Sequence, residues 1–274
     1  KQIPPKIDAG YAPGSETELF VNDLSMFGLP SDPGTTHPTL AAVGKKYVVL
    51  NYGNGSAPMY FQKTTGTKIG EVTLGAAKAT GAVTSDDCGN MLICNLAKNG
   101  EKLEIYKTND PTKAPEKIIT YTNGLGVDIG ARLHVYGDLN GNAVITATPS
   151  ACQNAIRWIV RNGQVGEPEN KQFNVGAWGD LDGIAKVASV DETGQKGAVC
   201  DYYADGDCQM FYFADWATPT NLVSNPHWGY NPGAIDVRGF NNSRYIALFE
   251  MGYWPSWGLN GSIFIYDATN PTAV

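Results

Sequence analysis

The sequence predicts an all-β fold, a five-bladed β-propeller, and three observations support this prediction. The chain contains 32 glycines and 11% aromatic residues, whereas charged residues make up only 17%. This composition suits short strands joined by tight turns and suits a helical bundle badly. The second observation is a turn-and-strand pattern that recurs five times, and the third is that the two chain ends complement each other.

The first predicted element is a strand over residues 17–24, TELFVNDL, which precedes the first repeat. The repeats follow as one domain over residues 1–274. We place the five blades at approximately 38–75, 78–121, 130–175, 184–224 and 233–274.

Each repeat opens with a polar turn that leads into an apolar strand, as in DDCGN before MLIC and DLNGN before AVIT. One turn residue marks each copy, and successive markers lie 45 to 53 residues apart: Gly44, Gly89, Gly141, Gly194 and Asn242. A variable loop and a second apolar strand follow each time. Four short strands per unit at this spacing predict a propeller. The alternative is an irregular β-sandwich with regularly spaced hairpins.

The last repeat ends at PTAV without an outer strand, and the strand at 17–24 supplies the missing one. An N-terminal strand that completes the last blade would close the ring and leave no open sheet edge.

In a propeller the links between blades and the loops between second and third strands emerge on one face, called here the loop face. The hairpins between first and second strands emerge on the opposite face, called the turn face. Aromatic side chains gather in the predicted loop-face segments of blades four and five. Rings beside polar donors suit a sugar, and the alternative is that they only fill gaps between loops. The candidate ligand-binding residues are Trp178, His227, Trp228, Tyr230, Tyr253, Trp254 and Trp257, with Asp201 and Glu250 as polar contacts.

Asp201 and Glu250 belong to a set of polar residues that end the second strand of each blade, with Asn51, Asn95 and Thr148. We expect the five to ring the central funnel, either as hydrated groups or as part of a site. Two facing carboxylates are what glycoside hydrolysis requires. Arg132, His134 and Asp236 lie near innermost strands and are expected close to such a site.

Other classes of function are excluded by what the sequence lacks. The net charge is −7 and no basic run occurs, so we expect no nucleic-acid partner. No apolar stretch predicts a membrane span. The DLNGN turn starts like a calcium loop but lacks the twelfth-position glutamate, and three histidines are too few for a three-histidine site. We expect no metal and no cofactor.

Five cysteines follow no metal-binding pattern. Cys200 and Cys208 are placed to face each other across a hairpin, and a disulfide there would fit an extracytoplasmic protein. The alternative is that these cysteines are buried as apolar residues.

The phrases YKTNDPTKAPEKI, YDATNPT and DLNGNAVIT, with the lysine-poor surface, resemble the propeller domains of secreted Bacteroides-type lipoproteins, many of unknown function and associated with glycan uptake. The resemblance implies an extracytoplasmic protein, at the cell surface or in the periplasm, tethered through a removed lipidated N-terminus. It carries over no catalytic motif.

Three functions remain open. The first is a monomeric, non-catalytic propeller that binds a carbohydrate or another small polar ligand on the aromatic loops. The second is a glycoside hydrolase or lyase that uses Asp201 and Glu250. The third is an interaction platform for an outer-membrane protein partner, served by the same aromatic patch.

Overall fold

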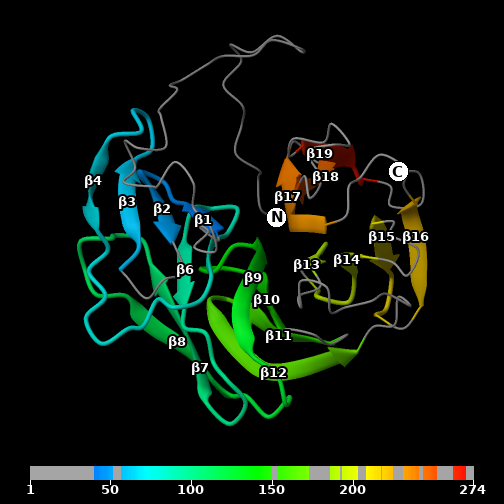
Figure 1. Cartoon of the computed structure of the whole chain (residues 1–274), viewed down its shortest axis with the longest axis horizontal. Coiled ribbons are helices and arrows are strands. Elements are labelled where there is room, and N and C mark those ends of the chain that lie inside the picture. Colours follow the sequence, from blue (N-terminus) through cyan, green and yellow to red (C-terminus); the bar gives the residue numbers. More distant parts are fainter. Residues whose placement is uncertain are drawn as a thin grey trace.

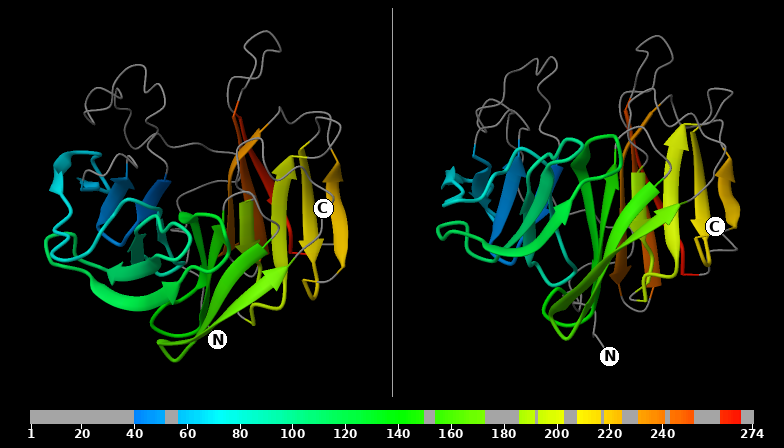
Figure 2. Two further views of the ribbon diagram at one scale, coloured as in Figure 1. Left: turned by 60° about the horizontal axis from the view of Figure 1, so that its bottom comes forward. Right: turned by 90° about the horizontal axis from the view of Figure 1, so that it is seen from below.

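The computed structural model confirms the predicted all-β propeller. It describes residues 40–51, 57–149, 154–172, 186–191, 193–202, 208–216, 218–224, 231–240, 243–251 and 262–269. These residues form four four-stranded antiparallel sheets and one three-stranded sheet, and no helix. Figures 1 and 2 show the sheets standing around a central axis.

Each sheet is an up-and-down meander in sequence order. The first contains β1 (Leu40–Val43), β2 (Tyr47–Asn51), β3 (Met59–Gln62) and β4 (Lys68–Glu71). The second contains β5 (Val83–Ser85), β6 (Met91–Cys94), β7 (Lys102–Thr108) and β8 (Glu116–Thr122). The third contains β9 (Ile129–Gly137), β10 (Ala143–Pro149), β11 (Asn154–Arg161) and β12 (Gln164–Gln172).

The fourth sheet contains β13 (Lys186–Ser189), β14 (Gly197–Tyr202), β15 (Cys208–Phe213) and β16 (Pro219–Ser224). The fifth contains β17 (Asn231–Phe240), β18 (Ser243–Met251) and β19 (Ser262–Asp267). The predicted closing strand at 17–24 lies outside the described residues.

The strand order places first strands at the axis and last strands at the rim. In Figure 1, β1, β9, β13 and β17 lie near the centre, and β4, β12 and β16 lie at the periphery. Consecutive first strands contact one another from β1 through β5, β9 and β13 to β17. First strands therefore carry the residues that can meet on the axis.

Burial explains why the second strands read as continuous apolar runs. Every residue of MLIC in β6 and of AVITATP in β10 is buried. A second strand is covered on both faces by the neighbouring sheets, so both sets of alternating side chains contribute to the core. The rim strand β12 is instead mostly exposed, and its sequence is mostly polar.

The repeated turns tie neighbouring blades together. The buried Asp86 carboxylate accepts hydrogen bonds from the backbone N–H groups of Cys88, Asn90 and Leu139 at 2.7 to 2.9 Å. The last donor belongs to the equivalent turn of the next blade. The recurring Asp–Gly turn is thus a structural device, and Asp138 likewise accepts the N–H of Asn140 at 2.9 Å.

The register of β14 and β15 shows where the backbone places the two cysteines expected to face each other. Cys208 lies opposite Tyr202, and Cys200 lies opposite Met210. The two cysteines are therefore not directly opposite each other in the backbone register. The structure does not describe their side chains, so the disulfide stays a prediction.

Candidate functional site

The predicted aromatic ligand residues cannot be placed. Trp178, His227, Trp228, Tyr230, Tyr253, Trp254 and Trp257 all lie outside the described residues. Asp201 lies in β14 and Glu250 in β18, the second strands of adjacent sheets, and the structure does not describe their side chains. Their role as ligand contacts or as a catalytic pair stays a prediction.

The predicted hydrated ring at the ends of the second strands is wrong for the three members whose side chains are described. Asn51, Asn95 and Thr148 are all buried. The Asn51 side-chain amide donates to the backbone carbonyl of Ala79 at 3.1 Å, in the link that leads to β5. A polar residue recurs there because buried loop backbone needs side-chain partners.

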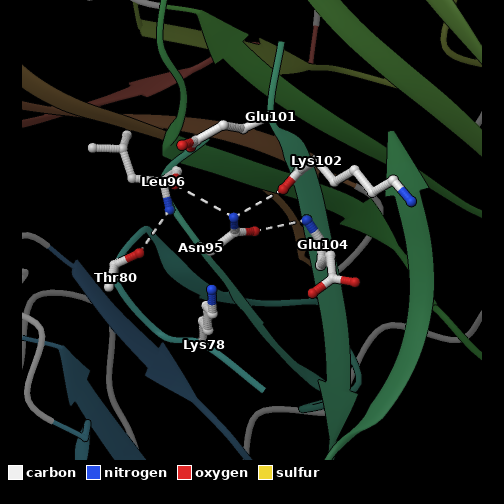
Figure 3. A pocket seen from close by; sticks show the side chains of 7 residues that line it. All are labelled: Lys78, Thr80, Asn95, Leu96, Glu101, Lys102 and Glu104. Atoms are coloured by element: carbon white, nitrogen blue, oxygen red, sulfur yellow. Dashed lines mark hydrogen bonds between the residues drawn. The ribbon is translucent and has the colours of Figure 1, made fainter. Parts of the chain in front are cut away.

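Asn95 organises a cavity on the loop face of the second blade. Its side-chain amide donates to the carbonyl of Lys102 at 2.9 Å, and its side-chain oxygen accepts the N–H of Glu104 at 2.7 Å. The Thr80 hydroxyl, from the link before β5, accepts the N–H of Leu96 at 3.0 Å. These bonds fix the loop before β7 against that link, as Figure 3 shows.

The loop-face cavity has a volume of about 540 Å³. Its lining residues are Lys78, Thr80, Asn95, Leu96, Glu101, Lys102 and Glu104. Two lysines and two glutamates balance in charge, so the cavity offers donors and acceptors without a net charge.

Glu104 and Lys78 in this cavity differ in whether their charged groups already have protein partners. Glu104 accepts from the Lys117 ammonium at 2.9 Å and from the Tyr106 hydroxyl at 2.8 Å. The hydrogen bond from Lys117 is the main cause that lowers the pKa of Glu104, so this carboxylate is a fixed acceptor. The ammonium of Lys78 is exposed and has no partner within the described part of the chain.

A second polar cluster lies on the axis, where His134 of β9 meets Asp236 of β17. The His134 Nε2 lies 3.2 Å from the Asp236 Oδ1. Arg238, two residues further along β17, donates from Nε to the Asp236 Oδ2 at 2.9 Å. Its other nitrogens donate to the Asp87 Oδ1 at 3.1 Å and to the Ser85 carbonyl at 2.8 Å. This bridge joins the fifth blade to the second.

The environment separates the pKa values of the two aspartates. Burial raises the pKa of Asp87, and the charge of Arg238 opposes this only in part. Burial acts in the same direction on Asp236, but the hydrogen bond from His134 and the charge of Arg238 together bring its pKa below the usual value. The two aspartates raise the pKa of Arg238 despite its burial, so the guanidinium stays charged.

Sequence reasoning missed Asp87 and Arg238, and it missed the loop-face lysine and glutamates. Asp87 follows Asp86 in a repeated turn. Both aspartates were assigned to the turn, so a separate role for Asp87 was not predicted. Arg238 lies 151 residues from Asp87, and no local pattern connects them. Only the position of each residue within its repeat related Asp87 to Arg238, because it places both residues near the ends of first strands.

Comparison with solved structures supports the fold. A DUF4623 family protein from Bacteroides eggerthii superimposes with a TM-score of 0.61 at 17% sequence identity, over 89% of this chain and 57% of that protein. The chain thus spans little more than half the length of that relative. A likeness at this identity shows a shared fold.

Two further solved structures resemble the chain more weakly. An arabinanase of Bacillus subtilis, Arb43A, has a TM-score of 0.49 and 9% identity over 85% of this chain and 94% of that one. The Aleuria aurantia lectin has a TM-score of 0.47 and 13% identity over 86% of this chain and 78% of that one. No curated protein matches the sequence. A family model described as a domain of unknown function, DUF8500, matches residues 18–274.

Proposed function

We propose that this chain, which belongs to the DUF8500 family of unknown function, is a non-catalytic propeller. It binds a carbohydrate or another small polar ligand on the loop face. The charge-balanced cavity beside Asn95 carries this proposal. The aromatic loops predicted for the same face are a separate support that rests on sequence alone.

The chemistry of the loop-face cavity matches that of a sugar. Each sugar hydroxyl both donates and accepts, so it needs a site that offers both kinds of partner. The unpartnered Lys78 ammonium supplies a donor, and the Glu101 and Glu104 carboxylates supply acceptors. A neutral ligand gains from this arrangement, because the lining charges cancel and a charged ligand meets equal attraction and repulsion.

Rigidity also favours binding at this cavity. The bonds that Asn95 and Thr80 make to loop backbone hold the lining in one arrangement before any ligand arrives. A preorganised site avoids the entropy cost of ordering its loops when the ligand binds. The described geometry of this cavity therefore supports binding.

A set of three variants tests the proposal by affinity electrophoresis through gels that contain plant and host polysaccharides. Lys78→Gln should weaken the retardation by the retarding glycan, and the double variant Trp254→Ala, Trp257→Ala should abolish it, with nearly unchanged melting temperatures. The control is Lys68→Gln, which alters an exposed lysine on the rim strand β4. If the glycan retards both test variants as strongly as the wild type, the glycan does not bind on the loop face.

The location of the protein stays a proposal as well. A cell-surface or periplasmic site, with a lipid anchor and an outer-membrane protein partner, would suit a glycan-binding module. Among the described residues, no helix is long and apolar enough to cross a membrane.

A further inference from the structure

A second cavity opens on the turn face, beside the axis and opposite to the loop-face cavity. It has a volume of about 570 Å³ and lies where β1, the turn after β5 and the strand β17 come together. The charged residues of its lining are Lys45, Lys63, Asp86, Asp87, Asp236 and Arg238. It shares no residue with the loop-face cavity.

The inner part of this cavity is acidic. Asp87, Asp236 and Arg238 form the ion-paired cluster described above, and their side chains are 15%, 46% and 30% exposed. Asp236 is the most accessible of the three. Its Oδ1 accepts the backbone N–H of Val237 at 3.0 Å and lies 3.2 Å from the His134 Nε2, and its Oδ2 accepts from Arg238, so one lone pair of Oδ2 remains for a ligand.

A third carboxylate adds to the negative charge without being available as a contact. Asp86 accepts the backbone N–H groups of Cys88, Asn90 and Leu139, and the Asn90 side-chain amide donates to it at 2.6 Å. Three carboxylates against one guanidinium leave the inner part with an excess of two negative charges.

The mouth of the cavity is basic. Lys45 lies in the exposed turn between β1 and β2, and Lys63 follows β3 and is also exposed. The Lys63 ammonium donates to the Gly44 carbonyl at 3.2 Å, which holds it beside the turn that borders the cavity. The two ammonium groups balance the inner excess, so the cavity is neutral as a whole and strongly dipolar.

From this charge separation we infer that the turn-face cavity binds a small zwitterion, with an ammonium group toward Asp236 and a carboxylate toward Lys45 and Lys63. Amino acids and short peptides have this chemistry. A simple anion would gain from the lysines but meet the acidic interior, and a simple cation would meet the lysines first. A ligand with both charges in the right order satisfies both ends of the cavity.

Isothermal titration calorimetry of the full chain tests this inference with four probes. Glycine and glycylglycine are the zwitterions, and the stronger binder of the two tells whether the source is an amino acid or a peptide. N-acetylglycine keeps only the anionic end, and glycinamide keeps only the cationic end. We expect saturable binding of at least one zwitterion and weaker binding of both one-charge analogues.

The double variant Lys45→Gln, Lys63→Gln removes the basic mouth at two exposed positions and leaves the inner cluster unchanged. It should weaken zwitterion binding by about fivefold, because exposed ion pairs each contribute modestly. Lys68→Gln, the matched exposed lysine on β4, should bind as the wild type does.

Absence of saturable binding by both zwitterions, equal binding of a one-charge analogue, or full affinity in the double lysine variant would each overturn the inference. The outcome is independent of the loop-face proposal. Lys78→Gln should leave zwitterion binding unchanged, and the double lysine variant should leave glycan retardation unchanged.

Discussion

Replacing Arg238 by methionine removes the only described side chain that bridges the fifth and second blades on the axis. The methionine side chain would keep much of the aliphatic length but leave Asp87, whose side chain is 15% exposed, without its cation. Loss of one partner from a fully buried pair costs about 3 to 5 kcal/mol, and loss of an exposed pair costs about 0 to 1 kcal/mol. Arg238 is 30% exposed, which places the expected loss between these limits.

We therefore expect Arg238→Met to lower the free energy of unfolding by about 2 to 3 kcal/mol. For a chain of this size that corresponds to a fall in melting temperature of roughly 5 to 10 °C. Urea unfolding followed by tryptophan fluorescence measures the first quantity, and differential scanning calorimetry measures the second. The control is Lys113→Met, which breaks an exposed ion pair with Asp110 and should change stability little.

The pH dependence of this loss has a defined sign. Without the guanidinium, the pKa values of Asp87 and Asp236 in the folded protein rise. A carboxyl whose pKa is higher in the folded than in the unfolded state favours folding only while protonated, and this contribution is lost as pH rises through the folded pKa. The variant should therefore differ most from the wild type at neutral pH and approach it only as pH falls below the usual carboxyl range, because the wild-type pKa of Asp236 lies below its usual value. A loss no larger than that of Lys113→Met, or one independent of pH, would refute the reasoning.

Three further changes test the account of the fold. Glu169→Gln should cost about 1 to 2 kcal/mol in urea unfolding at neutral pH, because it leaves the buried Arg157 guanidinium without its charged partner at 2.8 Å. The hydrogen bond from Arg157 lowers the pKa of Glu169, so this stabilisation is lost as pH falls through the folded pKa, and a difference that persists in acid would contradict the assignment. Gly137→Ala should cost about 2 kcal/mol in the same assay, because the residue has a φ of 96° and a Cβ would press on a carbonyl oxygen of the turn before β10. Gly100→Ala, with a φ of 83° and open space around it, should cost less. Deleting residues 17–24 should lower the melting temperature more than deleting eight of the first sixteen residues, and equal effects would show that this segment does not complete the last blade.

The repeat made most of the fold predictable, because each copy carries its own local signals. The turn that starts at Asp86 needs an acceptor for its backbone N–H groups, and the strand that follows, MLIC, is buried on both faces. The acceptor and the apolar strand lie next to each other in the sequence, so the sequence indicated this turn and strand at nearly every blade. The expected opposition of Cys200 and Cys208 depended on the hairpin register, where a shift of one residue in each strand changes which residues oppose each other.

The candidate sites were less predictable because they depend on contacts between blades. Asn95 follows the second strand β6, as expected, but its side chain is bonded to the backbone of Lys102 and Glu104. The bridge from Arg238 to Asp87 depends on how two first strands meet at the axis. Neither residue type nor spacing within one repeat contains that information.

The most direct test of the central claim is affinity electrophoresis of the wild-type chain with a reducing-end assay on the same polysaccharides. We expect retardation by at least one glycan, with no new reducing ends and no unsaturated products. Retardation accompanied by new ends would contradict the non-catalytic function and favour catalysis by Asp201 and Glu250. Free migration through every gel would contradict carbohydrate binding.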